Sequence, residues 1–233
     1  ASQQFASVPL NLSRADDMVD QVVTGQWSKK ALAEGKRLVN VNVASTSEDS
    51  NFSTIQAESD WELTAGAAYL HYCPNETIGG LEFDFVPRTH APVVADMSST
   101  ILSRPIDVDR FGVIYAGAQK NIGPAGLCLV IVKRELLDRA RSDIPAMLSW
   151  KISADNDSMY NTPPTFALYL SGLVFEWIEA KGGLAAMKAL NEKKASTLYS
   201  TIDDSGFYNN PVDVRYRSLM NVPFTLTNAS LDK

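Results

Sequence analysis

Lys120 is the residue whose type and setting most clearly suggest chemistry. It lies in a loop rich in glycine, Gly117–Gly126, between two apolar strand-like runs, Val113–Ala116 and Leu127–Val132. A lysine held on a tight loop between buried strands can be partly desolvated, and this makes its amine a better nucleophile. The alternative is an ordinary loop lysine with its ammonium group in water, and the spacing alone leaves that alternative open.

Asp96 is a second candidate, because it ends the short apolar run Pro92–Asp96. In open α/β sheets, ligands bind beyond the carboxyl ends of the strands, so this carboxylate is well placed for a site. A carboxylate near a nucleophilic lysine fits a pyridoxal phosphate site: the lysine forms a Schiff base, and the carboxylate pairs with the pyridine nitrogen so that the ring accepts electrons. The competing interpretation is that Asp96 only caps the turn that follows it.

Four longer motifs carry a resemblance to a known family. They are His71–Gly80 (His-Tyr-Cys-Pro-Asn-Glu-Thr-Ile-Gly-Gly), Ala95–Pro105, Gly117–Gly126 and Tyr160–Pro164 (Tyr-Asn-Thr-Pro-Pro). On these segments the chain resembles the phosphoserine aminotransferases, which are fold-type-I, class-V pyridoxal phosphate enzymes. The similarity runs from about Gln4 to the last residues of the chain.

The resemblance implies roles for four residues around the cofactor ring. Lys120 matches the Schiff-base lysine, whose freed amine moves a proton between the substrate α-carbon and the cofactor. Asp96 matches the partner of the pyridinium nitrogen, Trp27 the aromatic residue stacked on the ring, and Thr77 the residue on the ring-hydroxyl side. Without the resemblance, Trp27 would be interpreted as a core residue opening a helix, and Thr77 as a turn residue.

Further matches concern the cofactor phosphate. Gln119 matches a phosphate ligand, and Ala1 and Ser2 match backbone donors of a phosphate-binding loop. Asn161 and Thr162 match residues that reach the phosphate from a neighbouring subunit, so the resemblance implies a homodimer with shared active sites. On local sequence alone, the segment around Asn161 is a turn before a helix.

The reaction that the resemblance implies is transamination in serine biosynthesis. An amino group passes from L-glutamate to 3-phosphohydroxypyruvate, giving O-phospho-L-serine and 2-oxoglutarate. The family binds these anionic substrates with arginine and histidine residues that the resemblance places outside this chain, which looks shortened at both ends. Arg104 and Arg110 therefore receive no substrate role.

Two alternatives remain open from the sequence. One is a non-catalytic fragment that keeps the fold but lacks the substrate-binding arginines. The other is a different fold-type-I enzyme, either another small-acid aminotransferase or a sulfur-removing lyase. A lyase would be expected to carry an exposed, reactive cysteine, whereas Cys73 and Cys128 lie in apolar runs.

Composition narrows the class of protein. A net charge of −6 argues against nucleic acid as a partner, because a nucleic-acid-binding protein needs a basic face. No apolar run approaches the ~20 residues of a membrane-spanning helix, and two histidines with two scattered cysteines do not have the spacing of a metal site. Unpaired cysteines predict a cytoplasmic protein, although a cleaved organelle-targeting segment stays open.

Alternating strand and helix patterns predict an α/β fold with a mostly parallel sheet covered by helices, followed by the start of a smaller α+β C-terminal domain. The expected strands are Met18–Val23, Leu38–Ala44, Ala67–Cys73, Pro92–Asp96, Gly112–Tyr115 and Leu127–Val132, and the expected helices are Trp27–Arg37, Glu135–Arg141, Thr165–Ala180 and Leu184–Ser200.

Two expectations concern the second half of the chain. In the helix predicted over Thr165–Ala180, an apolar face is formed by Phe166, Leu170, Leu173, Val174 and Trp177. A strand-like pattern returns over Arg215–Thr227. The glycine pair at 182–183 predicts a boundary between a cofactor-binding domain, residues 1–183, and the connecting helix and beginning of a small domain, residues 184–233.

Overall fold

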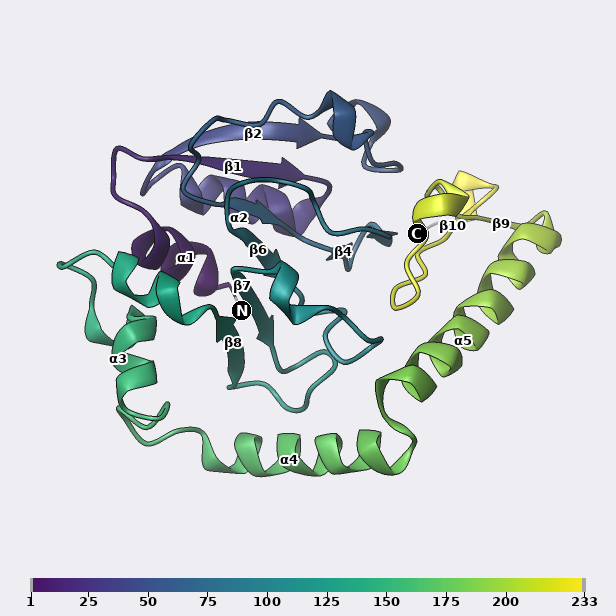
Figure 1. Cartoon of the computed structure of the whole chain (residues 1–233). Coiled ribbons are helices and arrows are strands. Elements are labelled where there is room, and N and C mark those ends of the chain that lie inside the picture. Colours follow the sequence, from purple (N-terminus) through teal and green to yellow (C-terminus); the bar gives the residue numbers. More distant parts are fainter. Residues whose placement is uncertain (1, 232–233) are drawn as a thin grey trace.

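A six-stranded sheet forms the centre of the computed structural model, which describes residues 2–231 (Figure 1). The strands lie in the order β2-β1-β3-β6-β7-β8; β8 is antiparallel to β7, and the other neighbours are parallel. Their bounds are Met18–Val23 (β1), Asn40–Thr46 (β2), Leu70–Tyr72 (β3), Val93–Asp96 (β6), Val113–Gly117 (β7) and Cys128–Val132 (β8). The predicted mostly parallel sheet is confirmed, and each of its strands overlaps a predicted one.

Strands β6 and β7 are buried along their whole length, because both faces of the sheet are covered. Their side chains alternate between two apolar cores. Val94 and Tyr115 point into the core beneath the first helices, whereas Ala95 and Ile114 point into the core on the opposite face. This two-residue period explains why the sequence shows continuous apolar runs here instead of alternation of polar and apolar residues.

Two helices cover one face of the sheet. They are α1 (Gln4–Leu12) and α2 (Gln26–Gly35), which pack against each other and, through α2, against β1 (Figure 1). The ring of Phe5 meets that of Tyr115 edge-on at a centroid distance of 6.4 Å. This contact fixes the start of α1 over the middle of the sheet.

The opposite face is covered by irregular segments and a short hairpin, β4 (Asn75–Glu76) and β5 (Leu81–Glu82). Three aromatic side chains pack there, Trp61, Phe83 and Phe85, with centroid separations between 5.4 and 6.4 Å. The segment after the hairpin thus contributes to the core without forming a helix.

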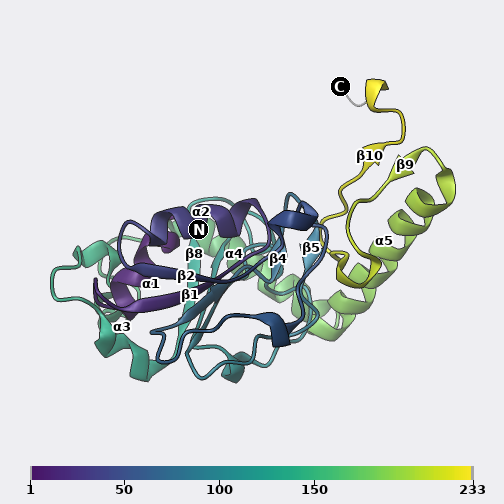
Figure 2. The same cartoon turned by 90° about the horizontal axis from the view of Figure 1, so that it is seen from above.

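Three further helices follow the sheet: α3 (Trp150–Asp155), α4 (Thr165–Ala180) and α5 (Gly183–Ser205). Helix α4 passes along the side of the main body, and α5 projects beyond it with the small β-ribbon that follows (Figures 1 and 2). Within residues 2–231, no helix combines the length and hydropathy that crossing a bilayer requires.

The bounds predicted for α4 are those observed, but its predicted apolar face is not buried within this chain. Phe166 is 71% exposed and Trp177 is 51% exposed. The buried residues are Ala167, Ser171 and Ile178. The helix touches the body along a narrow seam, where Ser171 packs directly against Gly123, so the large side chains around it face outward.

Two local predictions were wrong. The helix expected over Glu135–Arg141 is a 3-10 helix, Arg134–Arg139. The strand expected over Arg215–Thr227 reduces to β10 (Thr225–Leu226), which pairs with β9 (Tyr208–Asn209). The Asp213 side chain accepts a hydrogen bond from the Arg215 amide at 3.0 Å, and this cap starts a 3-10 turn where the strand was expected.

After that turn the chain folds back onto the β4–β5 hairpin. The Ser218 amide donates to the Gly80 carbonyl at 2.9 Å, and the Leu219 amide donates to Glu82 at 2.8 Å. Tyr199 of α5 donates to the Ser218 carbonyl at 2.8 Å. These bonds join the C-terminal segment to the hairpin beside the carboxyl ends of the strands.

Candidate active site

Two residues from separate elements lie against the amine of Lys120. Lys120 follows β7, Thr77 follows β4, and Trp27 lies in the first turn of α2. The Nζ atom of Lys120 donates to Thr77 Oγ1 at 2.6 Å and lies 4.9 Å from the centre of the Trp27 ring. Although the lysine is exposed overall, its amine is therefore positioned by a hydroxyl and an aromatic face.

Asp96 ends β6 as a buried carboxylate. Its Oδ1 atom accepts from the Ser98 amide at 3.0 Å and from the Ser98 hydroxyl at 2.5 Å. Ser98 Oγ also accepts from the Gly117 amide at 3.0 Å, which ties Asp96 to the loop of Lys120. The turn-capping interaction therefore exists, but it uses one oxygen. Among residues 2–231, Oδ2 accepts no hydrogen bond and Asp96 has no ion-pair partner.

Burial and charge act in opposite directions on these two groups. Burial raises the pKa of the Asp96 carboxyl, and the Ser98 hydrogen bonds and the Lys120 charge oppose that rise. Burial lowers the pKa of the Lys120 amine, and the acidic groups of Asp96, Cys73 and Glu76 oppose that fall. A lowered lysine pKa leaves more of the amine neutral, which is the nucleophilic form.

The other residues predicted for the site lie apart from this group. Gln119 is exposed beside Lys120, and Ser2 is exposed just before α1. Ala1 lies outside the described residues. Asn161 and Thr162 are exposed and line a separate depression of about 650 Å³ next to α4. Within the part of the chain that the structure describes, no hydrogen bond joins either residue to Lys120 or Asp96.

Sequence reasoning assigned no role to two residues that organise the group. Ser98 holds Asp96, as described above. Glu76 is fully buried and accepts hydrogen bonds from the first turn of α2. The sequence feature that could have indicated them is a polar residue in an otherwise apolar segment: Ser98 after Asp96, and Glu76 before Thr77. Such residues are buried only when partners satisfy them.

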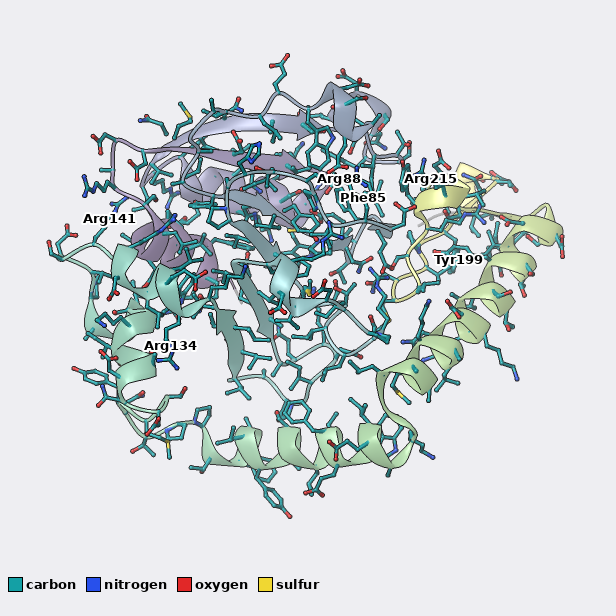
Figure 3. All side chains as sticks on the ribbon, viewed as in Figure 1. Phe85, Arg88, Arg134, Arg141, Tyr199 and Arg215 are labelled. Atoms are coloured by element: carbon teal, nitrogen blue, oxygen red, sulfur yellow. The ribbon has the colours of Figure 1, made fainter. Side chains whose placement is uncertain are left out.

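The two arginines that received no substrate role are occupied by structural contacts. Arg104 pairs with the buried Glu82 and also donates to the Phe83 carbonyl at 3.3 Å. Arg110 donates to the Val86 carbonyl at 3.0 Å. Of the arginines labelled in Figure 3, Arg134 and Arg141 lie at the α1–α3 end of the molecule, and Arg215 lies on the α5 side.

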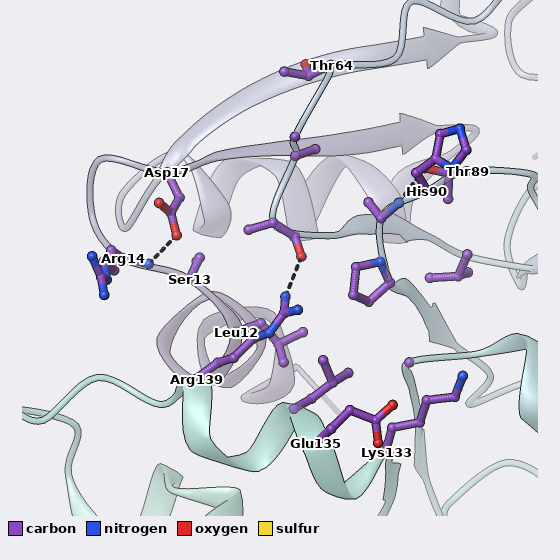
Figure 4. A pocket seen from close by; sticks show the side chains of 18 of the residues that line it. Leu12, Ser13, Arg14, Asp17, Thr64, Thr89, His90, Lys133, Glu135 and Arg139 are labelled. Atoms are coloured by element: carbon purple, nitrogen blue, oxygen red, sulfur yellow. Dashed lines mark hydrogen bonds between the residues drawn. The ribbon is translucent and has the colours of Figure 1, made fainter.

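A much larger depression, of about 1990 Å³, lies at the opposite end of the strands (Figure 4). Ala68, Pro92 and Gly112, which line it, come just before β3, β6 and β7. One wall is formed by Arg139, which donates to the Ala68 carbonyl at 3.3 Å. Neither Lys120 nor Asp96 lines this depression. The volume of a depression therefore does not by itself identify the residues of the candidate active site.

The residues around Lys120 suit a planar pyridine cofactor. Asp96 offers an oxygen without a donor, Trp27 offers a ring face, and Lys120 offers an amine of lowered pKa. The Trp27 Nε1–H group is buried without an acceptor in residues 2–231, so this region has polar capacity still to be satisfied.

Comparison with known proteins assigns the family. The family model described as aminotransferase class-V matches residues 1–233. The chain belongs to the class-V aminotransferases. A phosphoserine aminotransferase of Hahella chejuensis is 58% identical over 234 residues, covering 100% of this chain and 65% of that protein, and one of Pseudomonas aeruginosa shows the same identity and coverage. This class-V chain thus spans about two thirds of the length of these curated relatives.

Solved structures agree. A phosphoserine aminotransferase from Bacillus circulans subsp. alkalophilus matches with a TM-score of 0.95 and 44% identity, over 99% of this chain and 64% of that one. A phosphoserine aminotransferase from Trichomonas vaginalis, solved with PLP bound, matches with a TM-score of 0.92 and 43% identity, over 97% of this chain and 64% of that one. The class-V fold predicted from the motifs is confirmed.

Proposed function

We propose that this class-V chain carries the cofactor site of a phosphoserine aminotransferase. The proposed reaction passes the amino group of L-glutamate to 3-phosphohydroxypyruvate and yields O-phospho-L-serine and 2-oxoglutarate. The observation that carries it is the Lys120 amine, held between Thr77 and Trp27 at the end of the sheet where Asp96 has a free oxygen. The names and identities of the relatives support the choice of substrates.

Pyridoxal phosphate, when bound, supplies an electron sink for the charge that forms at the substrate α-carbon. Asp96 would hold the protonated pyridine nitrogen, Trp27 would stack on the ring, and Thr77 would contact its hydroxyl side. Gln119 and Ser2 would contribute phosphate contacts, as would Asn161 and Thr162 from a second subunit. A buried carboxylate suits a protonated nitrogen, because a charge-assisted hydrogen bond is strong where water is excluded.

Lys120 would act twice. Its amine would hold the cofactor covalently and, once freed, would act as the base that moves a proton from and to the substrate α-carbon. Burial lowers the pKa of this amine, so the base is more often neutral than an ordinary lysine at the same pH. The Thr77 hydroxyl accepts a hydrogen bond from Nζ and so directs the amine toward the ring position.

The exposed face of α4 supports the proposal of a homodimer. The α4 stripe, defined as Phe166, Tyr169, Leu173 and Trp177, repeats at helical spacing, and its members are between 41% and 71% exposed. Exposed aromatic stripes of this kind typically form protein–protein interfaces. The stripe follows directly after Asn161 and Thr162, so a second copy docked on it would receive these two residues near its own site.

We also propose the division into residues 1–183 and 184–233, with α5 as the connection. The cytoplasmic setting stays a prediction.

The proposed activity is tested by loading the chain with pyridoxal phosphate and following the formation of glutamate from O-phospho-L-serine and 2-oxoglutarate. L-alanine, offered in place of phosphoserine, is the matched control donor. We expect glutamate with phosphoserine and none with alanine.

Two other results would contradict the proposal for this chain in different ways. Turnover with alanine would indicate a different small-acid aminotransferase. A cofactor-loaded chain that converts neither donor would be the non-catalytic fragment, which retains the fold and the cofactor site but not the substrate-binding cations.

A further inference from the structure

Glu76, in β4, is a fully buried carboxylate that the proposed chemistry does not use directly. Among residues 2–231 no lysine, arginine or histidine forms an ion pair with it. A buried carboxylate is costly unless donors satisfy it. Its donors all come from one place, the first turn of α2.

The contacts are specific. Glu76 Oε2 accepts from the Trp27 amide at 3.0 Å, and Oε1 accepts from the Ser28 amide at 2.8 Å and the Ser28 hydroxyl at 2.6 Å. The first amides of a helix have no partner within the helix, and a side chain at the N-cap usually accepts from them. Here the N-cap is Gly25, which has no side chain. Glu76 therefore caps α2 from 48 residues further along the chain, where its charge also suits the helix dipole.

Gly25 makes this approach possible. A Cβ atom at position 25 would lie 2.6 Å from Glu76 Cδ and 2.7 Å from Oε2, well inside contact distance. The glycine thus leaves the space that the carboxylate occupies. The close approach of the two segments depends on both residues, Gly25 and Glu76.

The position of Glu76 links the two walls of the Lys120 site. Its side chain holds the backbone of Trp27, whose ring faces Lys120 Nζ at 4.9 Å. Its own backbone leads directly into Thr77, whose hydroxyl accepts from the same Nζ atom at 2.6 Å. The Trp27 ring on α2 and the Thr77 hydroxyl after β4 are therefore connected through the Glu76 residue.

We infer that Glu76 is a positioning residue that holds Trp27 and Thr77 at a fixed separation around Lys120, so that the cofactor ring enters a preformed slot. The inference rests on the proposed function for its ligand. It adds a residue that touches neither the cofactor nor the substrate and acts through the two that do.

Charge adds a second effect. The titratable groups around Lys120 are Asp96 at the end of β6, Cys73, Glu76, and Lys30 of α2, whose amine lies 4.5 Å from the centre of the Trp27 ring. The negative charge of Glu76 raises the pKa of the Lys120 amine against the effect of burial. Replacing Glu76 with a neutral side chain should therefore lower that pKa further.

The test compares Glu76→Gln with Glu82→Gln in the full chain. Glu82 is a matched control because it is also a buried carboxylate in the same hairpin, but it pairs with Arg104 and does not contact α2. Two quantities are measured: the dissociation constant for pyridoxal phosphate by absorbance titration, and, without cofactor, the pH at which Lys120 is half-labelled by a small amine reagent, located by peptide mass mapping. Thermal unfolding of each variant reports general stability.

We expect Glu76→Gln to weaken pyridoxal phosphate binding about tenfold or more, the usual effect of losing hydrogen bonds to a charged group, and to move the Lys120 labelling midpoint to lower pH. Glu82→Gln should leave both unchanged, even if it melts earlier. Gly25→Ala should also weaken pyridoxal phosphate binding, although it keeps the charge of Glu76. This variant provides a second test of the inference if Glu76→Gln does not fold.

Unchanged binding and an unchanged labelling midpoint in Glu76→Gln would overturn the inference, and so would equal shifts in Glu82→Gln. If the unaltered chain does not bind pyridoxal phosphate, the proposed function fails. The labelling midpoint of Lys120 would still test whether Glu76 acts on the Lys120 amine, because that measurement needs no cofactor.

Discussion

The two ends of the same strands differ: the amino ends border a large depression, whereas the carboxyl ends carry the candidate cofactor site. The amino ends open into a depression of about 1990 Å³ with several arginines around it. Two of these arginines donate to carbonyl groups: Arg139 to Ala68, and Arg141 to Ser13 and Leu38. The carboxyl ends carry the Lys120 amine against an aromatic ring, and a buried carboxylate with one oxygen that accepts no hydrogen bond among the described residues. Among the described residues, an amine of lowered pKa and a buried carboxylate oxygen without a donor come together at the carboxyl ends, and this is the combination that a pyridoxal phosphate site needs.

Among the substitutions that compare the two ends, Lys120→Ala should have the largest effect on the binding of pyridoxal phosphate. This change removes the amine that both Thr77 and Trp27 contact, so we expect the protein to lose specific retention of pyridoxal phosphate altogether. Arg139→Ala at the amino ends should retain the cofactor like the unaltered chain. Gel filtration with absorbance detection measures both, and equal retention by all three proteins would remove the distinction between the ends.

Asp96→Asn should have the next largest effect. The amide keeps the shape but cannot pair as an anion with a protonated ring nitrogen, so the dissociation constant of pyridoxal phosphate should rise about 10- to 100-fold. The free energy of unfolding without cofactor should not fall, because burial already disfavours the charged carboxyl.

The matched control for that change is Asp17→Asn, because Asp17 lines the depression at the amino ends. Cofactor affinity should not change in this variant. Absorbance titration and urea unfolding give the two quantities for each protein, and an unaltered dissociation constant in Asp96→Asn would contradict the role proposed for Asp96.

His71 lies in the strand between the two ends and gives a pH-dependent prediction. It is buried against Gln21 and Tyr115, and burial lowers its pKa from 6.5 to about 3. Between these values the unfolded chain binds a proton that the folded chain does not, so stability falls as the pH falls through this window. From pH 7 to pH 5 the histidine should cost about 2 kcal/mol of unfolding free energy.

Urea unfolding of the unaltered chain and of His71→Gln at both pH values isolates this contribution. Asp96 and Glu76, whose pKa values burial raises, act in the opposite direction in both proteins. A pH dependence of equal size in the two proteins would show that His71 is not kept neutral by the fold.

The smallest effect is expected for Arg141→Ala at the amino ends. Arg141 donates to the carbonyls of Ser13 and Leu38 at 2.9 and 2.7 Å, which join the end of α1 to the start of β2. Its loss should cost about 1 kcal/mol of unfolding free energy with no change in cofactor affinity. A change in cofactor affinity would mean that the two ends are coupled.

Sequence reasoning was most successful where one residue type and one local pattern decide the outcome. Apolar runs predicted the buried strands, and the glycine-rich turn predicted the position of Lys120 beyond β7. The exposed face of α4 was not predictable, because an apolar stripe does not say whether its partner lies in the same chain. The capping of α2 by Glu76 depends on residues far apart in sequence that only the fold brings together. The roles of the individual site residues stay predictions.

The most direct measurement is to incubate the chain with pyridoxal phosphate, reduce it with borohydride and locate the modified lysine by peptide mass mapping. Lys30 is an internal control, because its amine also lies within 4.5 Å of the centre of the Trp27 ring but has no contact with Thr77. The account predicts modification at Lys120 and not at Lys30. Modification of both, of scattered surface lysines, or of none would contradict the claim that the carboxyl ends of this sheet form a cofactor site.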